Sequence, residues 1–110
     1  MKAGGSVRIV LVTCGSVAEA RRIARAVVEK RLAACVNIVL GPVESVYRWK
    51  NKVETARERL LIIKTTVARL AELEREVKRL HKYEVPEFLV IGVSGGSHEY
   101  LDWVMKMSER

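Results

Sequence analysis

The side chains of this sequence best suited to bind a transition metal are its two cysteines and two histidines. Thiolate sulfur and imidazole nitrogen are favoured ligands of copper and zinc. Cys14 and Cys35 are too few and too isolated for a disulfide framework or a Cys-x-x-Cys metal motif, although each could serve as a lone ligand. Cys35 lies in an apolar stretch, where a free cysteine usually packs as a small hydrophobic residue. His98 follows Ser97 in the first turn of a predicted helix, where a solvated or capping role is expected.

Catalytic motifs are absent from the sequence. It contains no Ser-His-Asp arrangement, phosphate-binding loop, His-Glu-x-x-His run or dinucleotide-binding glycine motif. We therefore expect a protein that binds a ligand without catalysing a reaction.

The length and composition predict one soluble domain over residues 1–110. Hydrophobic residues make up 49% of the chain and charged residues 30%, a balance that can bury a core. The apolar runs, such as residues 60–63, are far shorter than the roughly 20 residues that span a bilayer. The apolar run at residues 9–12 is too short for a secretory signal. Together with the two isolated cysteines, this predicts a cytoplasmic protein without a membrane partner.

The net charge of +7, from 20 basic and 13 acidic residues, raises the possibility of an anionic partner. Much of this charge alternates in sign, as in residues 72–79, which is typical of a solvated helix face. Composition alone does not decide between these two interpretations.

Hydrophobic periodicity predicts elements in the order strand, helix, strand, strand, helix, strand, helix. They are expected at residues 7–13, 17–30, 34–49, 53–65, 67–81 and 88–93. Gly95, Gly96 and Ser97 are expected to break the last strand, and Ser97 can cap the final helix. Ser16 and Glu19 form a capping-box signature at the first helix, and Gly41-Pro42 predicts a bulge or a kink in the second strand. The order is that of the split βαβ, ferredoxin-like fold, an α+β sandwich with an extra C-terminal helix.

A long β-hairpin arm is the unusual feature of this prediction. Strands of about 14 residues reach roughly 45 Å, whereas a helix of about 14 residues is roughly 21 Å long, so the hairpin must project. Right-handed crossovers also place both long helices on one face of the sheet and leave the other face uncovered. Because such edges and faces invite aggregation, we expect another copy of the chain to cover them.

Five blocks of the sequence carry a resemblance to a known family. They are LAACVNI (32–38), SVYRWKNKVE (45–54), LLIIKTT (60–66), HKYEVPE (81–87) and EYLDW (99–103). In this order they resemble the CutA divalent-cation tolerance family, and the resemblance covers residues 7–103. It implies a ferredoxin-like homotrimer whose three sheets pack around an axis, similar to the PII signalling proteins. It also implies binding of a divalent metal, with copper the expected ion.

The same resemblance implies metal ligands of the Cys, His and Glu types. Glu87 completes the family's pattern of tyrosine, two residues, proline and glutamate, and His81 matches the histidine that begins that block. Thr13 aligns with a cysteine of some members, and Cys14 lies one position later, which on a strand turns the side chain to the other face. Antiparallel first and last strands would bring Cys14 near Glu87. The alternative is a small buried thiol and a surface carboxylate.

Further residues of these blocks could line clefts between subunits, where aromatic walls and a few charges would suit a small molecule. They are Tyr47, Trp49, Lys64, Tyr83 and Trp103. For Tyr47 and Trp49 the alternative is packing at the subunit interface. Lys64 follows an apolar run, so its ammonium needs a partner, and Glu87 is the candidate.

The leading hypothesis is therefore a non-catalytic homotrimer that binds a divalent metal ion. A PII-like signalling trimer with a small molecule in its clefts is the first alternative. An RNA-binding module would share the order of elements, but such modules stack bases on aromatic residues of the first and third strands. Residues 7–13 and 53–66 contain none, so a nucleic-acid partner is not expected. Acylphosphatases share the fold but need an arginine in the loop that Cys14, Gly15 and Ser16 form here.

Overall fold

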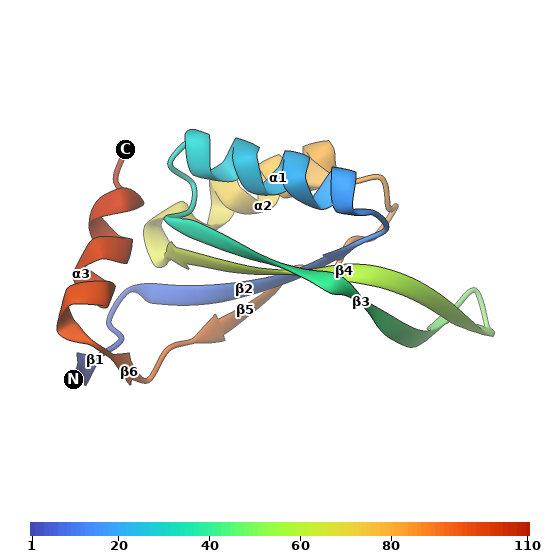
Figure 1. Cartoon of the computed structure of the whole chain (residues 1–110), viewed down its shortest axis with the longest axis horizontal. Coiled ribbons are helices and arrows are strands. Elements are labelled where there is room, and N and C mark those ends of the chain that lie inside the picture. The colour runs from blue at the N-terminus through green and yellow to red at the C-terminus, as the bar shows by residue number, and fades with distance from the viewer.

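A four-stranded antiparallel sheet with two helices on one face forms the body of the protein (Figure 1). The computed structural model describes residues 1–110. The strands are β2 (Val7–Cys14), β3 (Cys35–Trp49), β4 (Lys52–Thr66) and β5 (Leu89–Gly92), in the spatial order β3-β4-β2-β5. The two helices are α1 (Val17–Glu29) and α2 (Leu70–Leu80), and a short 3-10 turn (Val67–Arg69) precedes α2. This is the ferredoxin-like arrangement predicted from the periodicity.

The hydrophobic core lies between the sheet and the two helices. Val10 and Val12 of β2 alternate inward and are fully buried with Ile23 of α1 and Val77 of α2. At the start of α1, the Ser16 hydroxyl accepts a hydrogen bond from a backbone N–H three residues later at 3.1 Å, which confirms Ser16 as the predicted cap. The core and this cap therefore fix the end of β2 and the start of α1, which adjoin the site described below.

The helices α1 and α2 lie on one face of the sheet and leave the opposite face uncovered (Figure 1). The β-ladder pairs Leu11 of β2 with Ile62 of β4 and with Leu89 of β5, so these three side chains share this face. Leu89 is exposed, and Leu11 and Ile62 are only partly buried. We call the surface formed by these three residues the uncovered face.

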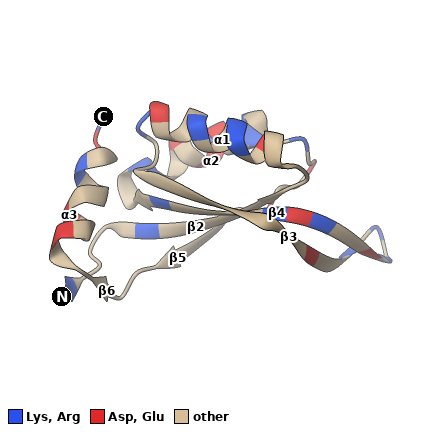
Figure 2. Ribbon diagram, viewed as in Figure 1, with Lys and Arg blue, Asp and Glu red and all other residues tan.

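The hairpin of β3 and β4 extends beyond the helices as an arm (residues 43–58), and the longest dimension of the molecule is 44 Å (Figure 1). The strand register shifts between Val39 and Val43, so the regular pairing is interrupted at Gly41-Pro42, where a bulge or kink was predicted. Lys50 and Asn51 form the tip with φ of 50° and 66°, the left-handed conformation that a tight hairpin turn requires. The charged residues of the arm include both signs, as Figure 2 shows.

The C-terminal helix α3 (His98–Met107) packs at the end of the sheet away from the arm (Figure 1). Its predicted cap is confirmed, because the Ser97 hydroxyl accepts from the Tyr100 backbone N–H at 3.2 Å. Leu101 and Val104 of this helix are buried together with Val7 of β2. The extra helix thus forms a small second core at one end of the sheet.

A second, two-stranded sheet was not predicted from the sequence. In this sheet β1 (Lys2–Ala3) pairs with β6 (Gly95–Gly96). The strand β5 does end before Gly95, as expected, but Gly95 and Gly96 also form a strand of their own. No helix of the structure combines the length and the apolar character needed to cross a bilayer.

Candidate functional site

A cavity of about 720 Å³ lies between the arm and the segment that joins α2 to β5, which we call the connecting segment (residues 81–88). Four arm residues of β3 line one side, and the end of β2 and Glu58 of β4 also contribute. The lining residues are Thr13, Ser45, Val46, Tyr47, Trp49, Glu58, Lys82, Tyr83, Glu84, Val85 and Glu87. The predicted site residues Tyr47, Trp49, Tyr83 and Glu87 are thus brought together within one chain.

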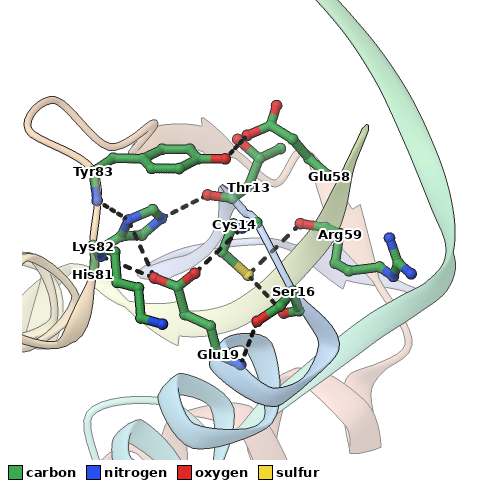
Figure 3. A network of polar contacts seen from close by, with 10 residues as sticks. Thr13, Cys14, Ser16, Glu19, Glu58, Arg59, His81, Lys82 and Tyr83 are labelled. Carbon is green, nitrogen blue, oxygen red and sulfur yellow. Dashed lines mark hydrogen bonds and ion pairs between the residues drawn. The ribbon is translucent and has the colours of Figure 1, made fainter. Parts of the chain in front are cut away.

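Three carboxylates line this cavity without a cationic partner, and two of them, Glu58 and Glu87, are at least partly buried. Glu58 is only 6% exposed, and its Oε2 accepts a hydrogen bond from the Tyr83 hydroxyl at 2.9 Å (Figure 3). No Lys, Arg or His side chain of the chain forms an ion pair with Glu58 or Glu87. Burial, and then the neighbouring Glu58 carboxylate, raise the pKa of Glu87 above its ordinary value. Negative charge in the cavity is therefore not neutralised by the chain itself.

Tyr83 connects the two sides of this cavity. Burial and then the hydrogen bond to Glu58 raise the pKa of the Tyr83 phenol, so its hydroxyl stays protonated and donates to the carboxylate. Its ring packs against His81, with ring centroids 4.7 Å apart. The position of Tyr83 therefore depends on how His81 is held.

His81 is held on both sides of its ring (Figure 3). Its side chain is completely buried, Nε2 lies 2.7 Å from the Thr13 carbonyl oxygen, and Nδ1 accepts from the Tyr83 backbone N–H at 3.1 Å. An Nδ1 that accepts places the ring proton on Nε2, which donates to Thr13. Both nitrogens are therefore occupied by bonds that fix the connecting segment against β2.

Glu19 anchors the same segment from α1. Its side chain is almost fully buried: Oε2 accepts from the Lys82 backbone N–H at 2.9 Å and Oε1 from the Gly15 backbone N–H at 3.3 Å (Figure 3). The capping box predicted for Ser16 and Glu19 is therefore only half formed. The Ser16 hydroxyl caps the helix, whereas the Glu19 carboxylate bonds to the residue before Ser16 and to the connecting segment.

Sequence reasoning missed the roles of Glu19 and Glu58 in this site. Glu19 lies beside the buried residues Ala20 and Ile23 of α1, so a charged residue at the edge of the apolar stripe was the available signal. The alternation of β4 places Glu58 on the same face as Leu60 and Ile62, where an acidic residue is unusual. In both cases the signal was a carboxylate in an apolar pattern.

Cys14 lies on the other side of the sheet from the cavity. It belongs to the hydrophobic core, and its Sγ lies 3.7 Å from the Ser16 carbonyl oxygen (Figure 3). Burial, and then the Glu19 carboxylate, raise its pKa to about 11, so it stays a thiol at neutral pH. The antiparallel pairing of β2 with β5 does bring the two segments together as predicted, but it is Thr13 that lines the cavity with Glu87.

The three predicted ligands therefore do not meet at one point within the chain. No group of three or more His, Cys, Asp or Glu side chains is arranged to hold a metal ion. Of the predicted ligands, only Glu87 lines the cavity, whereas His81 and Cys14 lie in the buried network behind it.

Lys64 and Trp103 are not among the residues that line the cavity. Lys64 lies opposite Ile9 and Cys35 in the sheet, and the expected ion pair between Lys64 and Glu87 is not formed within the chain. Trp103 packs beside Tyr100 on α3, with ring centroids 5.7 Å apart.

The expectation that Cys35 packs in the core was also wrong. It is half-buried, because its position in the ladder turns it away from α1 and α2.

Known proteins resemble this chain over most of its length. A family model described as CutA1 divalent ion tolerance protein matches residues 8–107. The divalent-cation tolerance protein CutA of Thermus thermophilus is 49% identical over 96 residues, which are 87% of this chain and 92% of that protein. Protein CutA of Homo sapiens is 45% identical over 105 residues, 96% of this chain but 58% of the human protein. The chain thus spans little more than half the length of its human relative.

Solved structures agree with the fold. The periplasmic divalent cation tolerance protein CutA from Archaeoglobus fulgidus superposes with a TM-score of 0.89 at 40% identity, covering 94% of this chain and 99% of that one. The PII-like protein CutA from Nostoc superposes with a TM-score of 0.84 at 36% identity, covering 93% and 97%. Coverage this high means that the likeness includes the sheet, the arm and the helices together.

Proposed function

The chain belongs to the CutA1 divalent ion tolerance family, and we propose that it is a non-catalytic homotrimer that binds a divalent cation, copper in particular, in the cavity beside Glu87. The observation that carries this proposal is the pair Glu58 and Glu87, two carboxylates in one cavity without a cationic partner. Buried carboxylates are usually paired with a cation or coordinate a metal. A bound cation would supply the missing positive charge.

The donor atoms available in the cavity are oxygens. Carboxylate oxygens of Glu58 and Glu87 and the Thr13 hydroxyl suit divalent cations, and Cu²⁺ binds a given oxygen or nitrogen site more tightly than the other first-row divalent ions. His81 would become a ligand only by giving up its bonds to Thr13 and Tyr83. In this proposal Glu87 is the ligand, and His81 and Cys14 support the cavity from behind.

Support for a trimer comes from apolar surfaces that a single chain leaves exposed. The uncovered face carries Leu11, Ile62 and Leu89, and burying such apolar side chains between copies of the chain would be favourable. The β5 edge is also exposed and apolar, with Val90 and Ile91 beside Leu89. Three copies packed through these sheets would remove both surfaces from water.

Calorimetric titration of the metal-free protein with Cu²⁺, with Zn²⁺ for comparison, tests the proposed function. We expect saturable binding at one site per chain, weakened at least about tenfold in Glu87→Ala. Glu54→Ala is the matched control, because Glu54 lies on the same hairpin and does not line the cavity. Binding that is indifferent to Glu87 would contradict the proposal.

A second candidate function is the binding of a small molecule, as in a PII-like signalling trimer. The size of the cavity favours it, since a volume of about 720 Å³ exceeds what a single metal ion needs and lies in the range of small-molecule sites. The aromatic side chains of Tyr47 and Trp49 would form one wall.

A further inference from the structure

The charges that line the cavity do not balance. Three carboxylates, Glu58, Glu84 and Glu87, accompany one ammonium group, Lys82, and Lys82 forms no ion pair. Among these groups Glu58 has the greatest need of a partner with positive charge, because it is more than nine-tenths buried. Its Oε2 accepts from Tyr83, whereas its Oε1 accepts no hydrogen bond from the chain and is not among the fully buried atoms, so it stays accessible from the cavity. A donor that carries positive charge would satisfy this oxygen.

Aromatic and apolar side chains form the remaining walls. Tyr47 and Trp49 lie on the arm, and Tyr83 lies on the connecting segment. The faces of such rings attract cations. Val46 and Val85 add apolar surface beside the rings. The lining thus combines acceptors for a cation with surface for an organic body.

We propose that the cavity binds a small organic cation, namely a guanidinium group that carries a short apolar tail. A guanidinium group is planar and weakly hydrated, donates to carboxylates in pairs and stacks on aromatic rings. Its donors meet Glu58 and Glu87, its plane lies against the arm aromatics, and its tail contacts the two valines. This inference rests on one part of the proposed function, namely that this cavity is the ligand site. The ligand differs: it is an organic cation instead of a divalent metal ion.

Titration of the metal-free protein with butylguanidinium and with butylurea, its neutral counterpart of similar shape, tests this inference. We expect butylguanidinium to bind about tenfold or more tightly than butylurea, because only the cation interacts with the carboxylates and ring faces. Fluorescence of Trp49 in a Trp103→Phe background reports whether the ligand reaches the arm. The preference should disappear in Glu58→Gln and in Glu87→Gln, and it should persist in Glu54→Gln.

Equal binding of the two compounds, or no saturation by about 10 mM, would overturn the inference. Glu87→Gln keeps the test decisive if Glu58→Gln does not fold. A parallel Cu²⁺ titration separates this inference from the proposed function. Copper binding at Glu87 without butylguanidinium binding refutes the organic ligand alone, whereas the reverse result supports the organic ligand and refutes the metal site.

Discussion

Carboxylates of this chain differ sharply in the partners that surround them. Hydrogen bonds from Arg79 and then Lys30, both at 2.8 Å, lower the pKa of Glu76 to about 2. Glu87 has no such partner, and burial beside Glu58 raises its pKa. The fold therefore pairs the buried Glu76 on its helical side and leaves Glu58 and Glu87 without a cationic partner in the cavity, where a bound cation would balance their charge.

The unpaired charge of Glu87 should lower the stability of the metal-free protein. Because its pKa is raised on folding, its ionisation is less favourable in the folded chain than in the unfolded chain. We expect Glu87→Gln to stabilise the fold at pH 7 by about 0.5–1 kcal/mol in urea unfolding. The difference should vanish as the pH falls below the ordinary carboxyl pKa, where both states are protonated. A loss of stability at pH 7 would contradict this assignment.

Glu76 should behave in the opposite way. Its lowered pKa means that the carboxylate stabilises the fold at neutral pH, and that this contribution is lost as the pH falls from 4.5 toward 2. We expect Glu76→Gln to cost about 1–2 kcal/mol at pH 7, a value reduced because Lys30 and Arg79 are exposed. Glu74→Gln, which breaks only an exposed pair with Lys78, is the control in urea unfolding. A cost for Glu76→Gln that does not change with pH would sink this interpretation.

The elements were predictable where side chains alternate or recur with helical spacing. The bounds of α1, β2 and α3 follow from apolar periodicity and from the caps Ser16 and Ser97. The pairing of β1 with β6 was not predictable, because Gly95-Gly96 carries no side-chain pattern and pairs through the backbone alone.

The candidate site was predictable only for the residues that belong to recognisable sequence blocks. Glu87, Tyr83, Tyr47 and Trp49 belong to blocks with a family resemblance, and they do line one cavity. The roles of Glu19 and Glu58 depend on tertiary contacts with the connecting segment, which no local pattern encodes.

The close approach of the segment after β1 to the segment before β6 can be tested by substitution of Gly4. A Cβ added at Gly4 would collide with the Val93 carbonyl oxygen, so Gly4→Ala must displace the backbone that leads into β6. We expect a loss of about 1–3 kcal/mol in thermal unfolding. Gly41→Ala is the control, because nothing lies within 4 Å of its Cβ position. Equal stability of the two variants would show that the close approach is not required.

The proposed trimer can be tested by introducing a charge on the uncovered face. Ile62→Asp would place a charge among the apolar side chains that we propose to lie between subunits, where an unpaired charge is costly. Sedimentation equilibrium should show a trimer for the unchanged protein and a smaller species for Ile62→Asp. Ala71→Asp, on the exposed side of α2, should remain trimeric. A monomeric unchanged protein would refute the proposed assembly.

We have proposed that a cation occupies the cavity beside Glu87. An anomalous difference map, recorded at the copper absorption edge from crystals grown with one equivalent of Cu²⁺ per chain, would show such a cation directly. We predict one strong peak per chain within bonding distance of the Glu87 carboxylate and close to Glu58. Peaks confined to other side chains, such as the exposed His98, would contradict the claim.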